Sequence, residues 1–229
     1  MKTGVILPTF RESADEALAV ARDAEALGVD GVFCYDHLWP MGQPERPALA
    51  PFPVLAAAAA TTSDLVVGTL VARVGLVPES VLVAEFEALE TVAPGRVVAG
   101  LGTGDHKSAA ENRAYGVPFA PAGERRAALW RIAGTIRERG IPVWVGAGTG
   151  TTGAIAEWEG EGVAANLWSA SPEAVSAWRA RTEVTWAGPA PAGAEAVTVL
   201  LRQLAAAGAT WAVLGWPAPL TVLAAHGER

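Results

Sequence analysis

Short apolar runs alternate with longer amphipathic segments along almost the whole of the 229-residue chain. An alternation of strands and helices with short connections favours a parallel sheet, because each helix returns the chain to the start of the next strand. About eight such units are visible, and eight units favour a closed (β/α)8 barrel, the TIM barrel, over an open sheet. At this length the barrel is lean, with reduced insertions and a curtailed C-terminal helix. We expect one domain over residues 1–229.

The expected elements follow one another without long gaps. Apolar runs predict strands at residues 4–7, 29–35, 65–72, 97–101, 141–147, 163–168, 184–187 and 210–215. Helical spacing of apolar residues predicts helices at residues 13–27, 52–62, 78–92, 123–139, 151–160, 171–181, 194–207 and 220–226. Ser13 and Glu16 match a capping box at the start of the first helix, and Gly28 suits the left-handed position at its end. Ser171 is a candidate N-cap for a later helix.

The composition narrows the class of protein. A net charge of −7 and a pI near 5.0, without a lysine- or arginine-rich run, argue against nucleic acid as a partner. Cys34 is the only cysteine and three histidines are present, so we expect no internal disulfide and no cysteine- or histidine-rich metal centre. The longest apolar tract, residues 56–77, contains Asp64 and Arg73 and predicts no membrane span. The N-terminus shows no small-residue cleavage site, so we expect a cytoplasmic protein.

The strand at residues 97–101 ends in the sequence GTGDH, residues 102–106. The glycines allow a sharp turn and leave room for a ligand against the backbone. A buried strand that ends in glycine, followed by an acid and an imidazole, is a common setting for a site in an α/β protein. An ordinary turn with a solvated Asp105–His106 pair is an equally good interpretation, because a lone GxG carries little information.

In a barrel the carboxyl ends of the strands converge on one face, where function concentrates. The second strand brings Asp36, His37 and Trp39 to that face. His37 suits proton transfer, since imidazole titrates near neutrality, and Asp36 or Asp105 could orient it. The alternative is a structural histidine that satisfies a neighbour's hydrogen bond. Trp39 could form one wall of a ring-binding site or simply anchor its loop.

The fifth strand runs into a second glycine-rich turn, GAGTG at residues 146–150, just ahead of an expected helix. Free amide N–H groups and the helix dipole attract an anion at such a turn. Gly148, Thr149 and Gly150 are therefore a candidate phosphate loop, although the segment does not match the GxGxxG pattern.

Several segments together resemble the luciferase-like monooxygenase family of flavin- and deazaflavin-dependent barrel oxidoreductases. The resemblance covers roughly residues 4–168 and is carried, in order, by ILPTF, AEALGVDGVFCYDHLWP, VGTLVARVGLVPESVLVAEFEALETVAPGRVVAGLGTGD, AYGVPF followed by ERRAALW, and PVWVGAGTG. It implies a (β/α)8 barrel that binds the deazaflavin coenzyme F420 or, alternatively, FMN.

The resemblance also implies roles for individual residues. His37, Asp105 and Trp39 would be catalytic, with Asp105 as general acid, His37 stabilising the developing anion and Trp39 beside the reacting centre. The peptide bond between Leu70 and Val71 would be cis and would lie behind the cofactor ring. The cofactor-binding residues would be Asp36, Thr69, Leu70, Val71, Thr103, Gly104, Gly148, Thr149 and Gly150.

Three functions remain open from the sequence. The first is an F420-dependent oxidoreductase that transfers a hydride to or from a small organic substrate. The second is an FMN-dependent monooxygenase, which needs a partner reductase. The third is a non-catalytic flavin-binding protein, because the long insertion that covers the substrate in typical members is missing from this short chain.

The helix over residues 78–92, from Pro78 to Val92, carries more apolar residues than one core face requires. In relatives this region forms a two-fold dimer, so the resemblance implies a homodimer. The alternative is a helix buried between its barrel neighbours.

Overall fold

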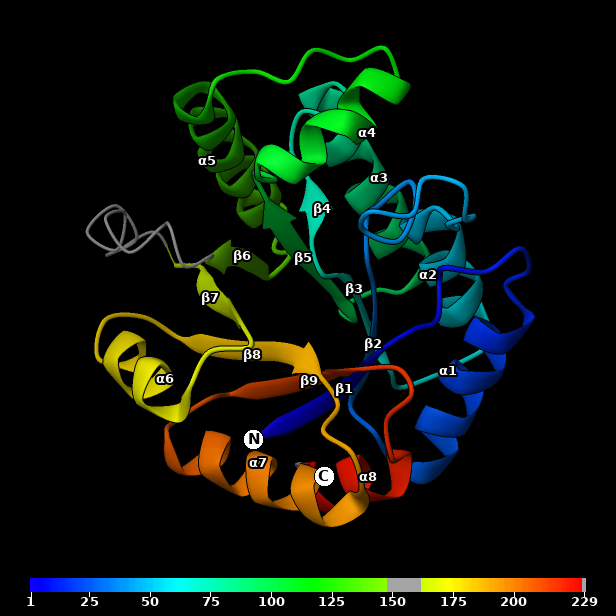
Figure 1. Ribbon diagram of the computed structural model, residues 1–229, viewed down its shortest axis with the longest axis vertical. Coiled ribbons are helices and arrows are strands. Elements are labelled where there is room, and N and C mark those ends of the chain that lie inside the picture. The colour runs from blue at the N-terminus through cyan, green and yellow to red at the C-terminus, as the bar shows by residue number, and fades with distance from the viewer. Residues whose placement is uncertain (148–161, 228–229) are drawn as a thin grey trace.

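A computed structural model describes residues 1–147 and 162–227 (Figure 1). Its strands are β1 (Lys2–Ile6), β2 (Gly31–Cys34), β3 (Val66–Thr69), β4 (Ala72–Arg73), β5 (Val97–Gly102), β6 (Val143–Ala147), β7 (Ala164–Trp168), β8 (Val184–Pro189) and β9 (Trp211–Gly215). Its helices are α1 (Asp15–Leu27), α2 (Pro51–Ala60), α3 (Glu79–Val92), the 3-10 helix η1 (His106–Ser108), α4 (Ala109–Ala114), α5 (Ala122–Glu138), α6 (Pro172–Arg179), α7 (Ala194–Ala206) and α8 (Leu220–His226).

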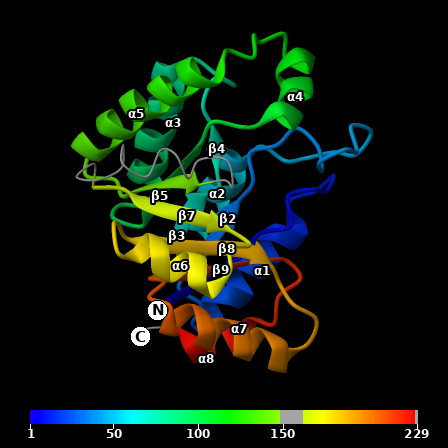
Figure 2. The same ribbon diagram turned by 60° about the vertical axis from the view of Figure 1, so that its left-hand side comes forward.

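The described strands form one parallel sheet in the order β3-β2-β1-β9-β8-β7-β6-β5-β4. Additional pairing between β3 and β5 joins the two ends of this order and closes the sheet. β4 continues the path of β3 along β5, so the nine strand segments fill eight positions. The helices surround the strands on the outside (Figures 1 and 2). The prediction of a (β/α)8 barrel is confirmed.

Aromatic side chains fill the inside of the barrel. Phe33 on β2 stacks on Trp144 of β6 at a centroid distance of 5.1 Å, and Trp211 of β9 meets both rings edge-on at 5.7 and 5.4 Å. Ile6, Val98 and Val213 also belong to this inner cluster. The lumen is therefore a packed core, and a ligand can reach the barrel only at its ends.

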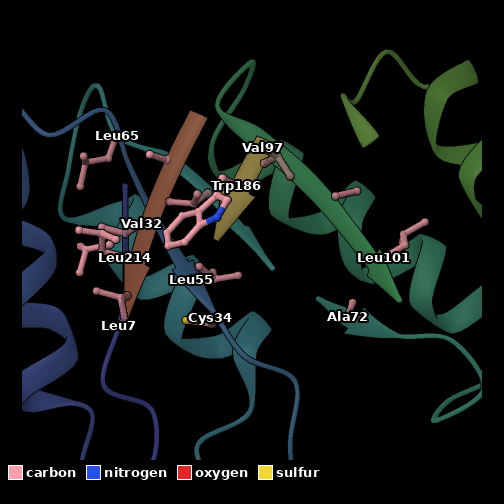
Figure 3. Close-up of a cluster of buried hydrophobic side chains, with 14 of the residues drawn as sticks. Leu7, Val32, Cys34, Leu55, Leu65, Ala72, Val97, Leu101, Trp186 and Leu214 are labelled. Atoms are coloured by element: carbon pink, nitrogen blue, oxygen red, sulfur yellow. The ribbon is translucent and has the colours of Figure 1, made fainter. Parts of the chain in front are cut away.

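A second apolar layer lies between the strands and the helices. Along β2, Val32 and Cys34 face this outer layer while Phe33 faces the lumen, because successive side chains of a strand point to opposite sides. Figure 3 shows Val32 and Cys34 together with Leu7, Leu55 and Leu214 in the outer layer. Burial in this apolar layer raises the pKa of the Cys34 thiol.

The ends of two helices test the predicted caps. Gly28 ends α1 with a φ of 90°, and the Ser171 hydroxyl accepts a hydrogen bond from the Ala174 amide of α6, so both of these predictions are confirmed. The prediction of a capping box at the start of the first helix is wrong. α1 begins one residue later than such a box requires, and the Glu16 carboxylate instead accepts hydrogen bonds from Arg11 and the Trp216 indole.

Two further differences separate the predicted elements from the structure. The single strand expected at residues 65–72 is two strands, β3 and β4, with a break at Leu70 and Val71. The sequence prediction also lacked η1 and α4, which follow β5. The helix expected at residues 151–160 lies outside the described residues. Among the described helices, none has the length and apolar character needed to cross a membrane.

Candidate functional site

The break between β3 and β4 shapes the carboxyl end of the barrel. The Leu70–Val71 peptide bond is cis, as the resemblance implies. Leu70 is 5% exposed and belongs to the inner cluster, whereas Val71 is partly exposed at the barrel end. The Thr69 hydroxyl donates to the Gly100 carbonyl oxygen at 2.7 Å, so this side chain ties β3 to β5 inside the barrel wall.

Glycines on the neighbouring strands leave the space that this break needs. A Cβ atom at Gly100 would overlap the Thr69 carbonyl oxygen, and one at Gly102 would overlap the Val71 side chain. A Cβ at Gly146 would lie 3.6 Å from the Val71 methyl groups. Val71 therefore packs against the glycine backbone of β5 and β6 and fills the space that side chains at Gly102 and Gly146 would take.

Asp36, the second residue after β2, contacts β4 on the far side of the break between β3 and β4. Its carboxylate accepts a hydrogen bond from the Arg73 backbone amide at 2.8 Å. Burial raises the pKa of the Asp36 carboxyl, although this amide and the nearby Arg73 and His37 side chains oppose the shift. Asp36 thus fixes β4 relative to β2.

His37 is oriented by a residue that the sequence prediction did not include. Its Nδ1 lies 2.9 Å from Glu111 Oε1, and the Leu38 amide donates to Glu111 Oε2 at 3.4 Å. The Glu111 side chain is 4% exposed and that of His37 is 27% exposed. The prediction that Asp36 or Asp105 orients His37 is wrong, because Glu111 occupies that position.

The same carboxylate is paired with a buried arginine. Arg73 Nη1 lies 3.0 Å from Glu111 Oε2, both side chains are 4% exposed, and Nη1 also donates to the Ser108 carbonyl oxygen at 3.3 Å. α4, which carries Glu111, lies beyond the arrowhead of β4 (Figures 1 and 2). Glu111 therefore connects the end of β4 with the loop after β2.

Asp105, by contrast, faces solvent. Its carboxylate accepts a hydrogen bond from the Lys107 amide at 2.8 Å and caps η1 together with Ser108. No hydrogen bond or ion pair links Asp105 to His37 within residues 1–147 and 162–227. Thr103 and Gly104 lie at the start of this loop, where Arg125 donates to both of their carbonyl oxygens.

The remaining predicted residues divide into two groups. Trp39 is partly buried in the loop after β2, and among the described residues no ring contact or hydrogen bond of its side chain is found. Gly148, Thr149 and Gly150 lie outside the described residues, so the predicted phosphate loop has no structural account here.

The sequence prediction did not include Glu111 or Arg73, although the sequence contains a signal for each of them. Ser108-Ala-Ala-Glu111 fits the S-x-x-E pattern that starts a helix, which would have predicted α4. Arg73 interrupts an apolar stretch, and a buried arginine requires an acidic partner. Neither signal identifies Glu111 as that partner, since the pairing depends on the fold.

Comparisons with known proteins agree with this architecture. The family model described as luciferase-like monooxygenase matches residues 1–130. An F420-dependent glucose-6-phosphate dehydrogenase of Beutenbergia cavernae is 39% identical over 119 residues, which cover 52% of this chain and 34% of that protein. An F420-dependent hydroxymycolic acid dehydrogenase of Mycobacterium tuberculosis is 32% identical over 103 residues, 44% of this chain and 29% of that protein. The chain thus spans about a third of the length of the curated relatives that it matches.

The fold itself recurs among solved structures. An F420-dependent secondary alcohol dehydrogenase in complex with an F420-acetone adduct superposes with a TM-score of 0.80 at 14% identity, over 100% of this chain and 99% of that chain. Identity at this level shows a shared fold and nothing finer. The family model covers more than half of the chain, and this chain therefore belongs to the luciferase-like monooxygenase family.

Proposed function

We propose that this protein is an F420-dependent oxidoreductase that transfers a hydride to or from a small organic substrate. The observation that carries the proposal is His37, which lies at the carboxyl end of the barrel with Nδ1 bound to a buried carboxylate. The similarity to F420-dependent dehydrogenases over half of the chain supports the choice of cofactor.

The described residues fit a planar cofactor. Val71 packs on the glycine backbone of β5 and β6 and stays partly exposed at the barrel end, where we propose that a tricyclic ring rests against it. Thr69 and Leu70 would support this position through the backbone, because their side chains are buried in the wall and the lumen. When bound, F420 supplies a deazaflavin ring that accepts or donates a hydride.

His37 is the residue that we propose to move the proton. A carboxylate accepts hydrogen bonds, so Glu111 selects the tautomer in which Nδ1 carries the hydrogen. Nε2 is then left as an acceptor, and no described residue forms a hydrogen bond with it. In this arrangement Nε2 takes the proton of a substrate alcohol, or returns it to a carbonyl oxygen.

Asp105 and Trp39 have supporting roles in this proposal. Asp105 Oδ1 is engaged with the Lys107 amide, so we assign the transferred proton to His37 rather than to Asp105. Asp105, Thr103 and Gly104 would then shape the edge of the cofactor site, with Asp36 holding β4 behind it. Gly148, Thr149 and Gly150 are proposed to bind the cofactor phosphate, and Trp39 to stand beside the reacting centre.

We also propose a homodimer through the region of α3. Val81 and Val92 are 42% and 46% exposed, whereas Leu82, Phe86 and Leu89 are buried, so the apolar surplus is smaller than the sequence suggested. A groove of about 380 Å³ lies between α3 and α5 and is lined by other residues, among them Val83, Ala84 and Ile132. Sedimentation velocity should give a dimer that Val81→Glu converts to a monomer; a wild-type monomer at micromolar concentration would remove this part of the proposal.

Cofactor titrations test the function directly. Binding of F420 and of FMN can be followed for the purified protein by fluorescence and calorimetry. Tight F420 binding with weak FMN binding supports the proposal. FMN binding alone would favour a monooxygenase, and binding of neither would favour a non-catalytic protein.

The proton transfer is tested by a pair of histidine variants. His37→Ala should lower kcat by roughly 100-fold or more, the usual effect of removing a general acid–base residue. The control is His106→Ala, because His106 is exposed on η1 and has no role in the proposal. Equal turnover by His37→Ala and the wild type would refute the assignment even if F420 binds.

A further inference from the structure

Three aromatic side chains meet beside His37 at the carboxyl end of the barrel. Tyr35 stacks on Phe10 with ring centroids 5.7 Å apart and meets Trp168 edge-on at 6.0 Å. The Tyr35 and His37 rings are 6.4 Å apart. Trp168, the last residue of β7, is 46% exposed. A large aromatic ring left open at the end of a barrel strand can contact a ligand there.

The Tyr35 hydroxyl is an available hydrogen-bond donor. Burial raises the pKa of Tyr35 to about 12, so the hydroxyl is protonated at neutral pH. Its ring lies across β1, since a Cβ atom at Gly215 of β9 would lie 3.6 Å from Tyr35 Oη. No described residue forms a hydrogen bond with this oxygen. The aromatic wall thus carries one polar group without a described partner, on a ring whose centroid lies 6.4 Å from that of His37.

The described loops on the β7–β9 side of this wall carry no charged residue. The segments after β7, β8 and β9 are Ser-Ala-Ser (residues 169–171), Ala-Pro-Ala-Gly (190–193) and Trp-Pro-Ala-Pro (216–219). On the Phe10 side, Arg11 is paired with Glu16 at 2.8 Å, and Arg46 donates to Gln43 at 3.0 Å and to the Phe10 carbonyl oxygen at 3.5 Å. The part of a ligand that packs on Trp168 therefore meets neutral and apolar groups from these three loops.

We infer that the substrate is an uncharged alcohol or ketone with an apolar or aromatic substituent. Its oxygen would accept a hydrogen bond from Tyr35 Oη and face His37 Nε2, while its substituent would pack on Trp168 and Phe10. This inference rests on the proposed function. Phe10, Tyr35 and His37 lie within residues 1–130, which the family model matches, whereas Trp168 and the loops after β7, β8 and β9 lie beyond that range.

The reaction balances as a two-electron transfer. In the direction of oxidation the carbinol C–H bond breaks, and the hydride passes to oxidised F420. The hydroxyl proton passes to His37 Nε2 as the carbon–oxygen double bond forms. Reduction of a ketone reverses both transfers and uses reduced F420 as the hydride donor.

Ligand binding can be tested without the cofactor. We expect acetophenone to give saturation-transfer NMR signals with the protein alone, strongest for its ring protons. Trp168→Ala should remove most of the signal and Trp168→Phe should restore it, because phenylalanine keeps an aromatic face. Acetophenone signals that are unchanged in Trp168→Ala would overturn the inference, whatever the cofactor titrations give.

Turnover then separates the two proposals. F420 reduction by 1-phenylethanol should exceed that by glucose 6-phosphate at equal concentration. Tyr35→Phe should lower kcat/KM for 1-phenylethanol by about tenfold, the effect of losing one hydrogen bond, without changing F420 binding. The matched control is Tyr115→Phe, at an exposed position on the end of α4.

The outcomes are distinguishable. Failure of the wild type to bind F420 overturns the proposed function. F420 binding with faster reduction by glucose 6-phosphate than by 1-phenylethanol overturns the substrate class alone. Equal kcat/KM for Tyr35→Phe and the wild type overturns the role of Tyr35.

Discussion

His37 Nδ1 and Glu111 Oε1 lie 2.9 Å apart, although 74 positions separate the two residues in the chain. The other oxygen of the same carboxylate lies 3.0 Å from Arg73 Nη1, and neither Glu111 nor Arg73 is more than 4% exposed in its side chain. The orientation of the proposed proton-transfer residue thus depends on a buried ion pair between β4 and α4.

The first prediction concerns the stability that this ion pair confers. Glu111→Ala leaves the Arg73 guanidinium buried without its acid and should lower the free energy of unfolding by about 3–5 kcal/mol. Urea unfolding followed by circular dichroism measures the change. Replacement of both partners, Arg73→Met with Glu111→Leu, should recover most of the loss, because neither member of the pair is then left buried without the other.

An exposed ion pair provides the control for that experiment. Glu79 and Arg131 form a 2.6 Å contact between α3 and α5, but their side chains are 45% and 61% exposed. Glu79→Ala should therefore change the free energy of unfolding by about 1 kcal/mol or less. An equal decrease in the free energy of unfolding for Glu79→Ala and Glu111→Ala would contradict the prediction that the buried pair contributes more to stability than the exposed one.

The second prediction concerns the glycines beside the β3–β4 break. Gly100→Ala places a methyl group against the Thr69 carbonyl oxygen, so the β3–β5 contact must shift, at a cost of about 1–3 kcal/mol. Gly134→Ala is the matched control, since a Cβ there meets no atom within 4 Å and alanine favours the α5 helix by about 0.5–1 kcal/mol. Thermal unfolding should shift in opposite directions for these two variants.

The barrel could be predicted from the sequence because its signals are local. Each strand and each longer helix has its own hydrophobic period, and eight repeats of the pattern limit the topology. Gly28 and Ser171 act through their own backbone neighbourhood, and both were assigned correctly. Trp144 and Trp211 pack in the inner cluster, as aromatic residues within apolar strand segments commonly do.

The arrangement of the site depends on contacts between distant parts of the chain. Glu111 lies on a six-residue helix, which is too short to show a clear apolar period. Glu16 fits a capping box by spacing, yet the Trp216 indole, 200 positions away, takes one of its oxygens. Trp168 ends an apolar strand segment, and its partly exposed position against Tyr35 depends on strands that are far apart in the chain.

The third prediction concerns pH and Asp36. Because burial raises the pKa of this carboxyl in the folded state, its stabilising contribution is present below the ordinary carboxyl value and is lost as the pH rises through the raised value. The Asp36→Asn variant does not show this loss of stability, because asparagine does not titrate. The free energy of unfolding of the variant minus that of the wild type should therefore become more positive between pH 4 and pH 7.

Glu16 provides a control of opposite sign for the Asp36 experiment. Hydrogen bonds from Arg11 and Trp216 lower the pKa of Glu16, so its contribution is present at neutral pH and is lost on acidification. The difference between Glu16→Gln and the wild type should shrink as the pH falls. Parallel pH dependence of the Asp36 and Glu16 variants would contradict at least one of the two assignments.

The last prediction concerns the ionisation of Tyr35, on which the proposed hydrogen bond to substrate depends. The chain contains only two tyrosines, Tyr35 and Tyr115, so tyrosinate absorbance at 295 nm reports on these two alone. Burial raises the pKa of Tyr35 to about 12, and the stability that its neutral form contributes is lost as the pH rises from about 10 through that value. Tyr35→Phe should remove the later absorbance step and Tyr115→Phe the earlier one. Circular dichroism over the same pH range identifies any step that is caused by unfolding, and a single shared transition near pH 10 would contradict the burial of Tyr35.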